Sequence, residues 1–127
     1  MIQKETRLFV IDNSGASQVK CIGFFKGSKK NRASLGEIIK VSVQSLKKKG
    51  SLKVKKGQIF NALVVTCKKD IGSRKRLNGF SKKFFFNNVI LLNNNNKMVG
   101  TRIINPIDTY LRSNLQLKTI LINYNYI

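Results

Sequence analysis

The chain has 127 residues, of which 25 are Lys or Arg, 5 are Asp or Glu and none is His, so its formal net charge is +20. The length suits one domain, and 42% hydrophobic residues suffice for a core, which excludes a disordered basic tail. Residues 84–96 form the longest uncharged stretch, but asparagines interrupt it, which excludes a membrane-spanning segment. We expect one basic domain over residues 1–122 and a loose tail over residues 123–127.

The first two-thirds of the chain predict short β-strands separated by turn signals. Alternation is clearest at Ile39, Val41 and Val43, which should face inward, whereas residues 59–65 are apolar on both parities, as in a strand covered on both sides. Short strands joined by turn-rich loops predict a small antiparallel β-barrel. In chain order, the expected strands are residues 6–11, 19–25, 36–46, 59–65, 89–92 and 99–104.

The carboxy-terminal part predicts short amphipathic helices. Asn105 should be the N-cap, Pro106 the first helical residue, and Asp108 an acid in the first turn. We expect these helices to cover the second apolar face of the strand around Ala62. The apolar residues that suggest them lie four positions apart, in the pairs Ile107/Leu111 and Leu117/Leu121.

Catalytic and metal sites find little support in the sequence. The acids Glu5, Asp12, Glu37, Asp70 and Asp108 are scattered over different elements, whereas glycoside-type hydrolysis needs a defined pair of carboxylates. Asp12 precedes Asn-Ser-Gly and is expected to form a turn. Without histidine there is no catalytic triad, so we expect no enzyme activity and no cofactor.

The two cysteines are expected to be structural. Cys21 and Cys67 are 46 residues apart and each lies in an apolar, strand-like run. Two thiols alone cannot form a zinc site, which needs four ligands. A buried free thiol behaves as a small hydrophobic group, so we expect neither a metal nor a disulfide.

Most of the positive charge lies in three segments, residues 26–32, 47–57 and 68–83. At +20 self-repulsion is large, and a partner of opposite charge compensates for it. Phosphate backbones suit lysine-rich loops because each neutralised phosphate releases counterions. A membrane surface would need a basic amphipathic helix, but the helical end carries only Arg112 and Lys118. We therefore expect nucleic-acid binding without membrane insertion.

Aromatic residues cluster at residues 24–25 and 84–86. Such rings can stack on unpaired bases. Because strands adjoin both clusters, core packing is the favoured interpretation for each Phe. The asparagine run at residues 93–96 is compatible with RNA contact or with codon bias in a loop.

Short motifs follow one another in a fixed order, beginning with Met-Ile-Gln at residues 1–3 and Asp-Asn-Ser-Gly-Ala at residues 12–16. In this order the chain resembles the universal large-subunit ribosomal protein L-fourteen family of bacterial and organellar type. Two departures are a lengthened basic loop between Val65 and Asn78, and Phe85 and Phe86 in place of small or polar residues. The remaining motifs lie at residues 19–22, 36–40, 54–57, 62–65, 87–94, 100–103, 106 and 111–113.

The resemblance implies a five-stranded β-barrel with short carboxy-terminal helices. It also implies binding to large-subunit rRNA and bridges to small-subunit rRNA across the subunit interface. Implied protein partners are L-nineteen and a ribosome silencing factor that blocks subunit joining. On this chain, the resemblance places Gly100, Thr101 and Arg102 on the face toward the small subunit or the factor.

We interpret the sequence as a non-catalytic structural protein of a large ribosomal subunit; the alternative is a free-standing basic RNA-binding barrel that acts in translation or RNA maturation. The abundance of Lys (19), Asn (14) and Ile (14) suggests an AT-rich genome, and with an amino terminus lacking a presequence it favours a mitochondrial ribosome over a plastid or bacterial one. The expected rRNA-binding residues are Lys29, Lys30, Arg32, Lys47, Lys48, Lys49, Lys53, Lys55, Lys56, Arg74, Lys75, Arg76, Lys82, Lys83 and Arg102.

Overall fold

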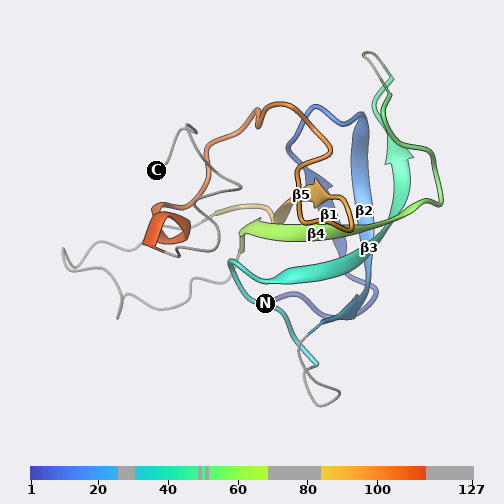
Figure 1. Ribbon diagram of the computed structural model, residues 1–127. Coiled ribbons are helices and arrows are strands. Elements are labelled where there is room, and N and C mark those ends of the chain that lie inside the picture. Colours follow the sequence, from blue (N-terminus) through green and yellow to red (C-terminus); the bar gives the residue numbers. More distant parts are fainter. Residues whose placement is uncertain (26–30, 49, 51, 69–83, 114–127) are drawn as a thin grey trace.

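The computed structural model describes residues 1–25, 31–48, 50, 52–68 and 84–113. Within them the chain forms a closed β-barrel in which consecutive strands are neighbours (Figure 1). The predicted five-stranded barrel is therefore confirmed. Its strands are β1 (Arg7–Val10), β2 (Ala16–Phe24), β3 (Ile38–Leu46), β4 (Ile59–Thr66) and β5 (Asn88–Leu92).

The barrel closes through a parallel seam. Each strand from β1 to β5 runs antiparallel to the next, as expected. With an odd number of alternating strands, the first and the fifth must point the same way. β1 and β5 accordingly pair in parallel, with Phe9 opposite Asn88 and Val10 opposite Val89. The description "antiparallel" thus holds for every seam except the closing one.

The barrel interior is filled by alternate residues of the strands. Ile39, Val41 and Val43 of β3 are buried as predicted, whereas Lys40 between them is exposed. On β2 the simple alternation breaks, because register shifts beside Gln18 and after Cys21 change which residues face inward. The inner core extends beyond the strands to residues such as Ile2, Ala33 and Val54.

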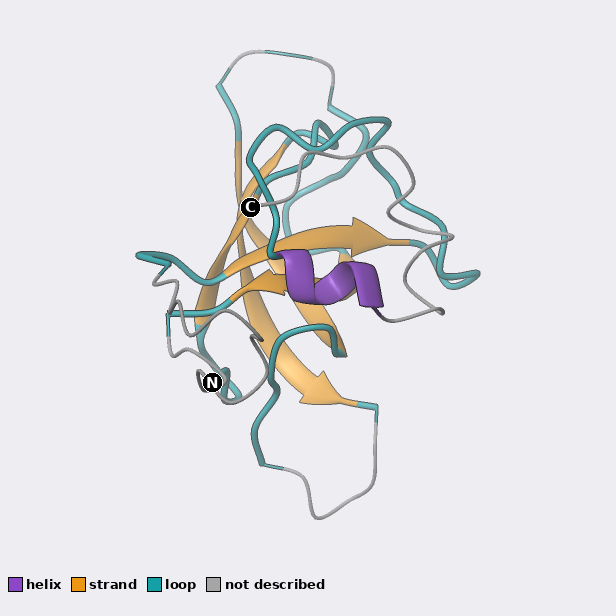
Figure 2. Cartoon of the chain, turned by 90° about the vertical axis from the view of Figure 1, so that its left-hand side faces the viewer, coloured by secondary structure: helices purple, strands orange, loops and turns teal. Residues whose placement is uncertain are grey.

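A second apolar cluster lies outside the barrel. Leu63 and Val65 of β4 and Ile90 of β5 pack there against Ile107 and Leu111. β4 is thus covered on both faces, as its sequence predicts. The covering segment runs from Ile107 into η2 (Thr109–Ser113), a 3-10 helix that lies over the outside of the strands (Figure 2). The second predicted helical pair, Leu117/Leu121, and the predicted tail lie outside the described residues.

The start of the helical part differs from the prediction. Asn105 is not the N-cap, because helical structure begins at Thr109 rather than at Pro106. Asp108 takes the capping position: its Oδ1 accepts a hydrogen bond from the backbone N–H of Tyr110 at 3.0 Å, and its carbonyl oxygen accepts one from Leu111 at 3.1 Å. A carboxyl group that accepts a free N–H of the first turn fixes where a helix starts.

The strand predicted at residues 99–104 is not formed. The chain there makes only isolated bridges, from Met98 to Leu92 and from Ile103 to Asp12. β1 already has β2 and β5 as neighbours, so no strand edge is left there for a sixth strand to join. Some apolar residues of this part of the chain are instead used for packing, with Val99 against the inner core and Met98 and Ile103 against the outer cluster, whereas Ile104 is exposed.

Candidate nucleic-acid interface

The connection between β3 and β4 carries the largest described group of predicted RNA-binding lysines. We call its described residues, 47, 48, 50 and 52–58, the basic arm; it lies on the side of the barrel opposite η2 (Figure 1). Lys48, Lys53, Lys55 and Lys56 are exposed on it, and so is Arg32 in the preceding connection. The other candidates, which lie outside the described residues, are Lys29, Lys30, Lys49, Arg74, Lys75, Arg76, Lys82 and Lys83.

Backbone hydrogen bonds hold the basic arm against the barrel. The N–H of Lys53 donates to the carbonyl oxygen of Ser14 at 2.9 Å, and the N–H of Gly57 donates to that of Val43 at 2.8 Å. Between two exposed lysines, Val54 is buried in the inner core, with 3% of its surface accessible. Because their backbone is anchored on both sides, Lys53 and Lys55 are displayed from a fixed base.

The end of the arm that leads into β4 is a tight turn that favours glycine. Gly57 has a φ of 83°, in the left-handed region where a side chain would be strained. The N–H of Gln58 donates to the carbonyl oxygen of Lys55 at 3.3 Å, and the Gln58 side chain accepts from the N–H of Lys55 at 3.1 Å. Lys55 and Lys56 therefore project from an ordered turn, beside a shallow hollow lined by residues 52–56 and Gln58.

Lys47 serves an internal contact. Its backbone N–H donates to the carbonyl oxygen of Gly15 at 2.8 Å, and its Nζ donates to the carbonyl oxygen of Asp12, also at 2.8 Å. The side chain is only half exposed. Among the described lysines of the arm, Lys47 is thus the one for which a hydrogen bond from the ammonium group to the protein is seen. RNA contact through Lys47 stays a prediction.

The turn at residues 12–15, the hub turn, is built around a fully buried carboxyl group. One oxygen of Asp12 accepts from the backbone N–H of Ser14 at 2.9 Å and from the Ser14 hydroxyl. The other accepts from the backbone N–H of Leu91 on β5 at 2.8 Å. Asp12 therefore forms a turn, as predicted, and it also ties that turn to the closing strand.

The neighbouring Asn13 holds the segment 100–102 in place. Its Oδ1 accepts from the backbone N–H groups of Thr101 at 2.7 Å and Arg102 at 3.2 Å, while its Nδ2 donates to the Thr101 hydroxyl at 2.7 Å. Gly100 packs so closely that an added Cβ would lie 2.9 Å from Asn13 Oδ1 and 2.9 Å from the Cβ of Asp12. Thr101 and Arg102 remain exposed beyond this contact.

The hub turn thus joins two candidate sites that the sequence showed only as separate motifs. Asn13 binds the segment 100–102, and the next two residues, Ser14 and Gly15, bind the basic arm. Sequence reasoning missed this connection, because it interpreted residues 12–15 as an isolated turn. A signal was present in the Asp-Asn-Ser-Gly run, whose side chains favour hydrogen bonds to backbone groups.

Two of the described acids are withdrawn from the surface of the site. Asp12 and Asp108 are buried, with 0% and 5% of their surface accessible. Glu5 is exposed but forms an ion pair with Lys20, and Glu37 accepts from the backbone N–H of Ser34 at 3.1 Å. The carboxyl groups of Asp12 and Asp108 are thus removed from solvent, and that of Glu5 is already paired with a lysine outside the basic arm.

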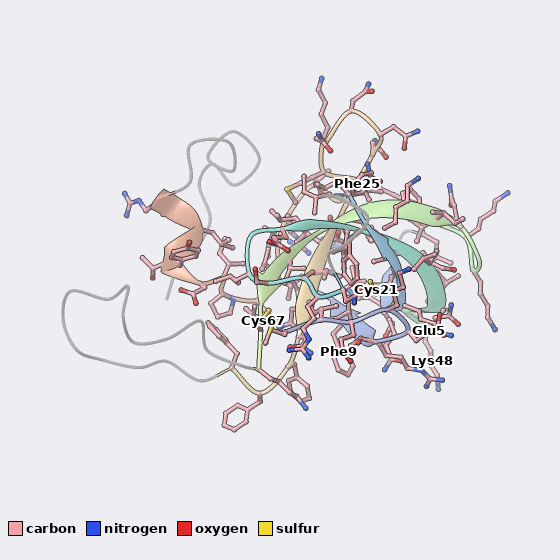
Figure 3. The ribbon with its side chains drawn as sticks, turned by 90° about the horizontal axis from the view of Figure 1, so that it is seen from below. Glu5, Phe9, Cys21, Phe25, Lys48 and Cys67 are labelled. Carbon is pink, nitrogen blue, oxygen red and sulfur yellow. The ribbon has the colours of Figure 1, made fainter. Side chains whose placement is uncertain are left out.

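The cysteines lie within the barrel, as expected. Cys21 and Cys67 are free thiols and both are buried (Figure 3). Desolvation by burial raises the pKa of each thiol above its ordinary value of 9.0. In the described ranges no three His, Cys, Asp or Glu side chains are grouped to hold a metal ion. The same ranges contain no helix with the length and hydropathy needed to cross a membrane.

The aromatic residues depart from the core positions predicted for them. Phe24 packs against the inner core, but Phe25, Phe85 and Phe86 are exposed, with 50%, 76% and 55% of their surfaces accessible. The two rings at residues 85 and 86 precede β5, which begins at Asn88, so they lie before the sheet rather than in it. Being apolar was not sufficient to place them inside.

The geometry describes a closed barrel that displays cations at its surface. A comparison with protein families agrees with that description: the family model of ribosomal protein L14p/L23e matches residues 1–125. The chain therefore belongs to the ribosomal protein L14p/L23e family, whose members are structural, non-enzymatic proteins of the large ribosomal subunit that bind rRNA.

Proposed function

We propose that the basic arm binds large-subunit rRNA while the segment 100–102 faces the small subunit. The observation that carries this proposal is the hub turn, which fixes both elements through consecutive residues. Because one turn positions both, the cationic surface and the segment 100–102 form one continuous structure. Such a protein can hold rRNA on one side and contact the small subunit with a neighbouring part.

The mechanism on the rRNA side is electrostatic scaffolding. Lysine ammonium groups act as point charges toward phosphates, and phosphate contacts position a protein without reading base sequence. Lys53, Lys55 and Lys56 are exposed on an anchored backbone. Binding then orders the side chains but leaves the arm unchanged. Cations held in this way reduce the repulsion between RNA segments that approach each other.

On the subunit-interface side, the expected contacts come from Thr101 and Arg102. Both are exposed, and their backbone is fixed by the amide of Asn13. The proposed partners at this face are small-subunit rRNA, through a bridge, and a ribosome silencing factor that competes with subunit joining. L-nineteen is the proposed neighbour within the large subunit. These partners rest on the family resemblance.

We further propose that the ribosome is mitochondrial. The support is compositional: Lys, Asn and Ile together make up a large share of the chain, with 19, 14 and 14 residues, while Pro occurs once and Trp not at all. Codons rich in A and T encode the frequent residues. An AT-rich organellar genome produces this bias, and the plastid and bacterial alternatives are distinguished by locating the protein in fractionated cells.

The experiment that tests the interface is subunit joining with a charge-reversed variant. Large subunits carrying Arg102→Glu should be assembled and compared with subunits carrying Arg112→Glu, a matched reversal on η2, on the other side of the barrel from the basic arm (Figure 1). We expect Arg102→Glu to reduce association with small subunits while the protein stays in the large subunit at one copy. Equal association for both variants would refute the interface assignment. Loss of the parent protein from salt-washed large subunits would instead favour a free-standing RNA-binding factor.

A further inference from the structure

Phe9 of β1 and Phe86, whose rings are in contact, are exposed together with the adjoining Phe85 before β5, and we call these three residues the aromatic patch. Phe9, Phe85 and Phe86 have 39%, 76% and 55% of their surfaces accessible to solvent. None of them belongs to either apolar cluster of the protein. Exposed apolar residues are common one at a time, but a pair of large rings in contact, with a third exposed ring next to it in sequence, suggests a partner.

The patch is held in a fixed arrangement. Phe9 lies on the outer face of β1, where it alternates with the buried residues Leu8 and Val10. The ring of Phe86 meets it edge to face, with centroids 5.2 Å apart and planes at 76°. Such pairs are favoured over stacked sandwiches, so Phe9 supports Phe86 from the side.

The backbone beneath the patch is also fixed, by a buried threonine. The Thr66 hydroxyl donates to the carbonyl oxygen of Phe86 at 3.1 Å and accepts from the N–H of Asn88 at 3.2 Å. The side chain of Asn87 accepts from the N–H of Lys68 at 2.8 Å. The rings are thus presented to solvent by an ordered turn, which lowers the entropy lost when a flat partner binds.

The charges around the patch are positive. Arg7 lies two residues before Phe9 on the same face of β1, and Lys68 lies beside Asn87; both are exposed. The nearest described acid along β1, Glu5, is already paired with Lys20. A neighbouring protein would have to bring acidic groups to such a rim, whereas a nucleotide brings a phosphate together with a flat base.

We propose that the aromatic patch stacks on an unpaired base of rRNA, with Phe85 and Phe86 offering the rings and Arg7 and Lys68 meeting the adjoining phosphates. This site rests on the proposed rRNA binding and adds a second, non-electrostatic contact to it. Every base has a π-face, so stacking on phenylalanine tolerates any base identity. The patch therefore recognises single-stranded RNA rather than a particular sequence.

The test uses the full chain and a short single-stranded RNA that carries 2-aminopurine, whose fluorescence is quenched when it stacks. Titrations should be made at a salt concentration that suppresses phosphate contacts. We expect the parent to quench the probe and the Phe85→Leu/Phe86→Leu variant, which keeps apolar area but loses the rings, to bind about 10-fold more weakly. The slope of affinity against salt should not change.

The matched control is Phe25→Leu. Phe25 is similarly exposed but lies apart from Phe9, with the Lys40 Nζ 5.6 Å from its ring centroid (Figure 3). Its loss should change affinity by less than about twofold, as expected for a surface residue away from the contact. Circular dichroism of all variants establishes that the barrel remains folded.

Two results would overturn the proposal. The first is equal affinity and equal quenching for the parent and the double variant. The second is a double variant that binds the RNA normally but is lost from large subunits, since the patch would then contact a protein. Neither result contradicts rRNA binding through the basic arm, which is tested separately. That proposal is refuted if replacing Lys55 and Lys56 leaves RNA affinity unchanged.

Discussion

The hub turn and the aromatic patch differ in where their side chains find interaction partners. The Asp12 carboxyl and the Asn13 amide at the hub turn find hydrogen-bond partners inside the protein, some from residues that are 79 to 89 positions away. The aromatic patch is equally well ordered, but its rings face solvent. A site whose side chains bind partners within the protein stabilises the fold. An ordered site whose side chains face solvent is suited to an external partner. The same distinction separates Lys47, which binds Asp12, from the exposed Lys55 and Lys56.

The largest expected effect is on stability, at the centre of the hub turn. Asp12→Ala removes the acceptor of three hydrogen bonds and leaves the buried donors of Ser14 and Leu91 without it. An unsatisfied buried polar group costs about 1–3 kcal/mol, so the free energy of unfolding should fall by about 3 kcal/mol or more. Urea denaturation followed by circular dichroism measures it. Phe85→Ala, in the aromatic patch, should change the same quantity by less than about 0.5 kcal/mol. Similar losses of unfolding free energy for Asp12→Ala and Phe85→Ala would show that the two sites do not differ in their contribution to stability.

A smaller loss is expected where the segment 100–102 meets the hub turn. Gly100→Ala places a methyl group 2.9 Å from Asn13 Oδ1, so the segment must move, at a cost of about 1–3 kcal/mol. Gly23→Ala is the matched control, because a Cβ there meets nothing within 4 Å. The control should be neutral or slightly stabilising. Thermal unfolding compares the two, and subunit joining should be weakened by the first alone. A Gly100→Ala protein as stable as the Gly23→Ala protein would show that the close contact is not restrictive.

The basic arm should give an effect on binding without an effect on stability. Lys55→Ala/Lys56→Ala removes two exposed cations from an ordered turn. The slope of RNA affinity against salt should fall by about one unit for each phosphate that is no longer neutralised. Lys4→Ala/Lys97→Ala removes the same charge from exposed positions outside the arm and should retain most of the slope. Filter binding over a salt series distinguishes them. Identical slopes for the two double variants would mean that net charge, rather than the arm, governs binding.

The smallest effect concerns the buried thiols and appears only in alkali. Burial raises the pKa of Cys21 and Cys67 in the folded protein, so the unfolded chain loses these protons first as the pH rises. Their contribution is therefore complete below the ordinary thiol pKa of 9.0 and is lost as pH rises through the folded pKa. The parent should lose more stability above pH 9 than Cys21→Ala/Cys67→Ala, by less than about 1 kcal/mol just above that pH. Parallel pH curves for the two proteins would contradict this.

Local patterns were enough to predict most of the barrel. The alternation at Ile39, Val41 and Val43 and the two-sided apolar run of β4 correspond directly to the inner and outer clusters. Segment 99–104 was predicted wrongly, because its apolar residues suit a strand while its fixing partner, Asn13, lies 88 residues before Thr101. Periodicity carries no information about such a partner.

The candidate site was only partly predictable for a related reason. Charge identified the lysines of the basic arm, but charge alone does not separate Lys47, which binds Asp12, from Lys55, which faces solvent. Hydrophobicity placed Phe85 and Phe86 in the core, whereas the start of β5 at Asn88 leaves them before the sheet. In each case, whether a side chain is buried, paired or exposed depends on where the strands begin and on which residues the closed barrel brings together.

The parallel seam between β1 and β5 also determines the order in which the protein can fold. β2 and β3 are neighbours in sequence and can pair early. The second edge of β1 can pair only after β5, which begins at Asn88, has been made. Closing a long loop is entropically slow, so barrel closure is expected to be a late step. During synthesis the edge of β1 is exposed until β5 has left the ribosome, and the Leu91 N–H then reaches Asp12. The lysines of the arm are therefore made before the barrel that positions them is closed.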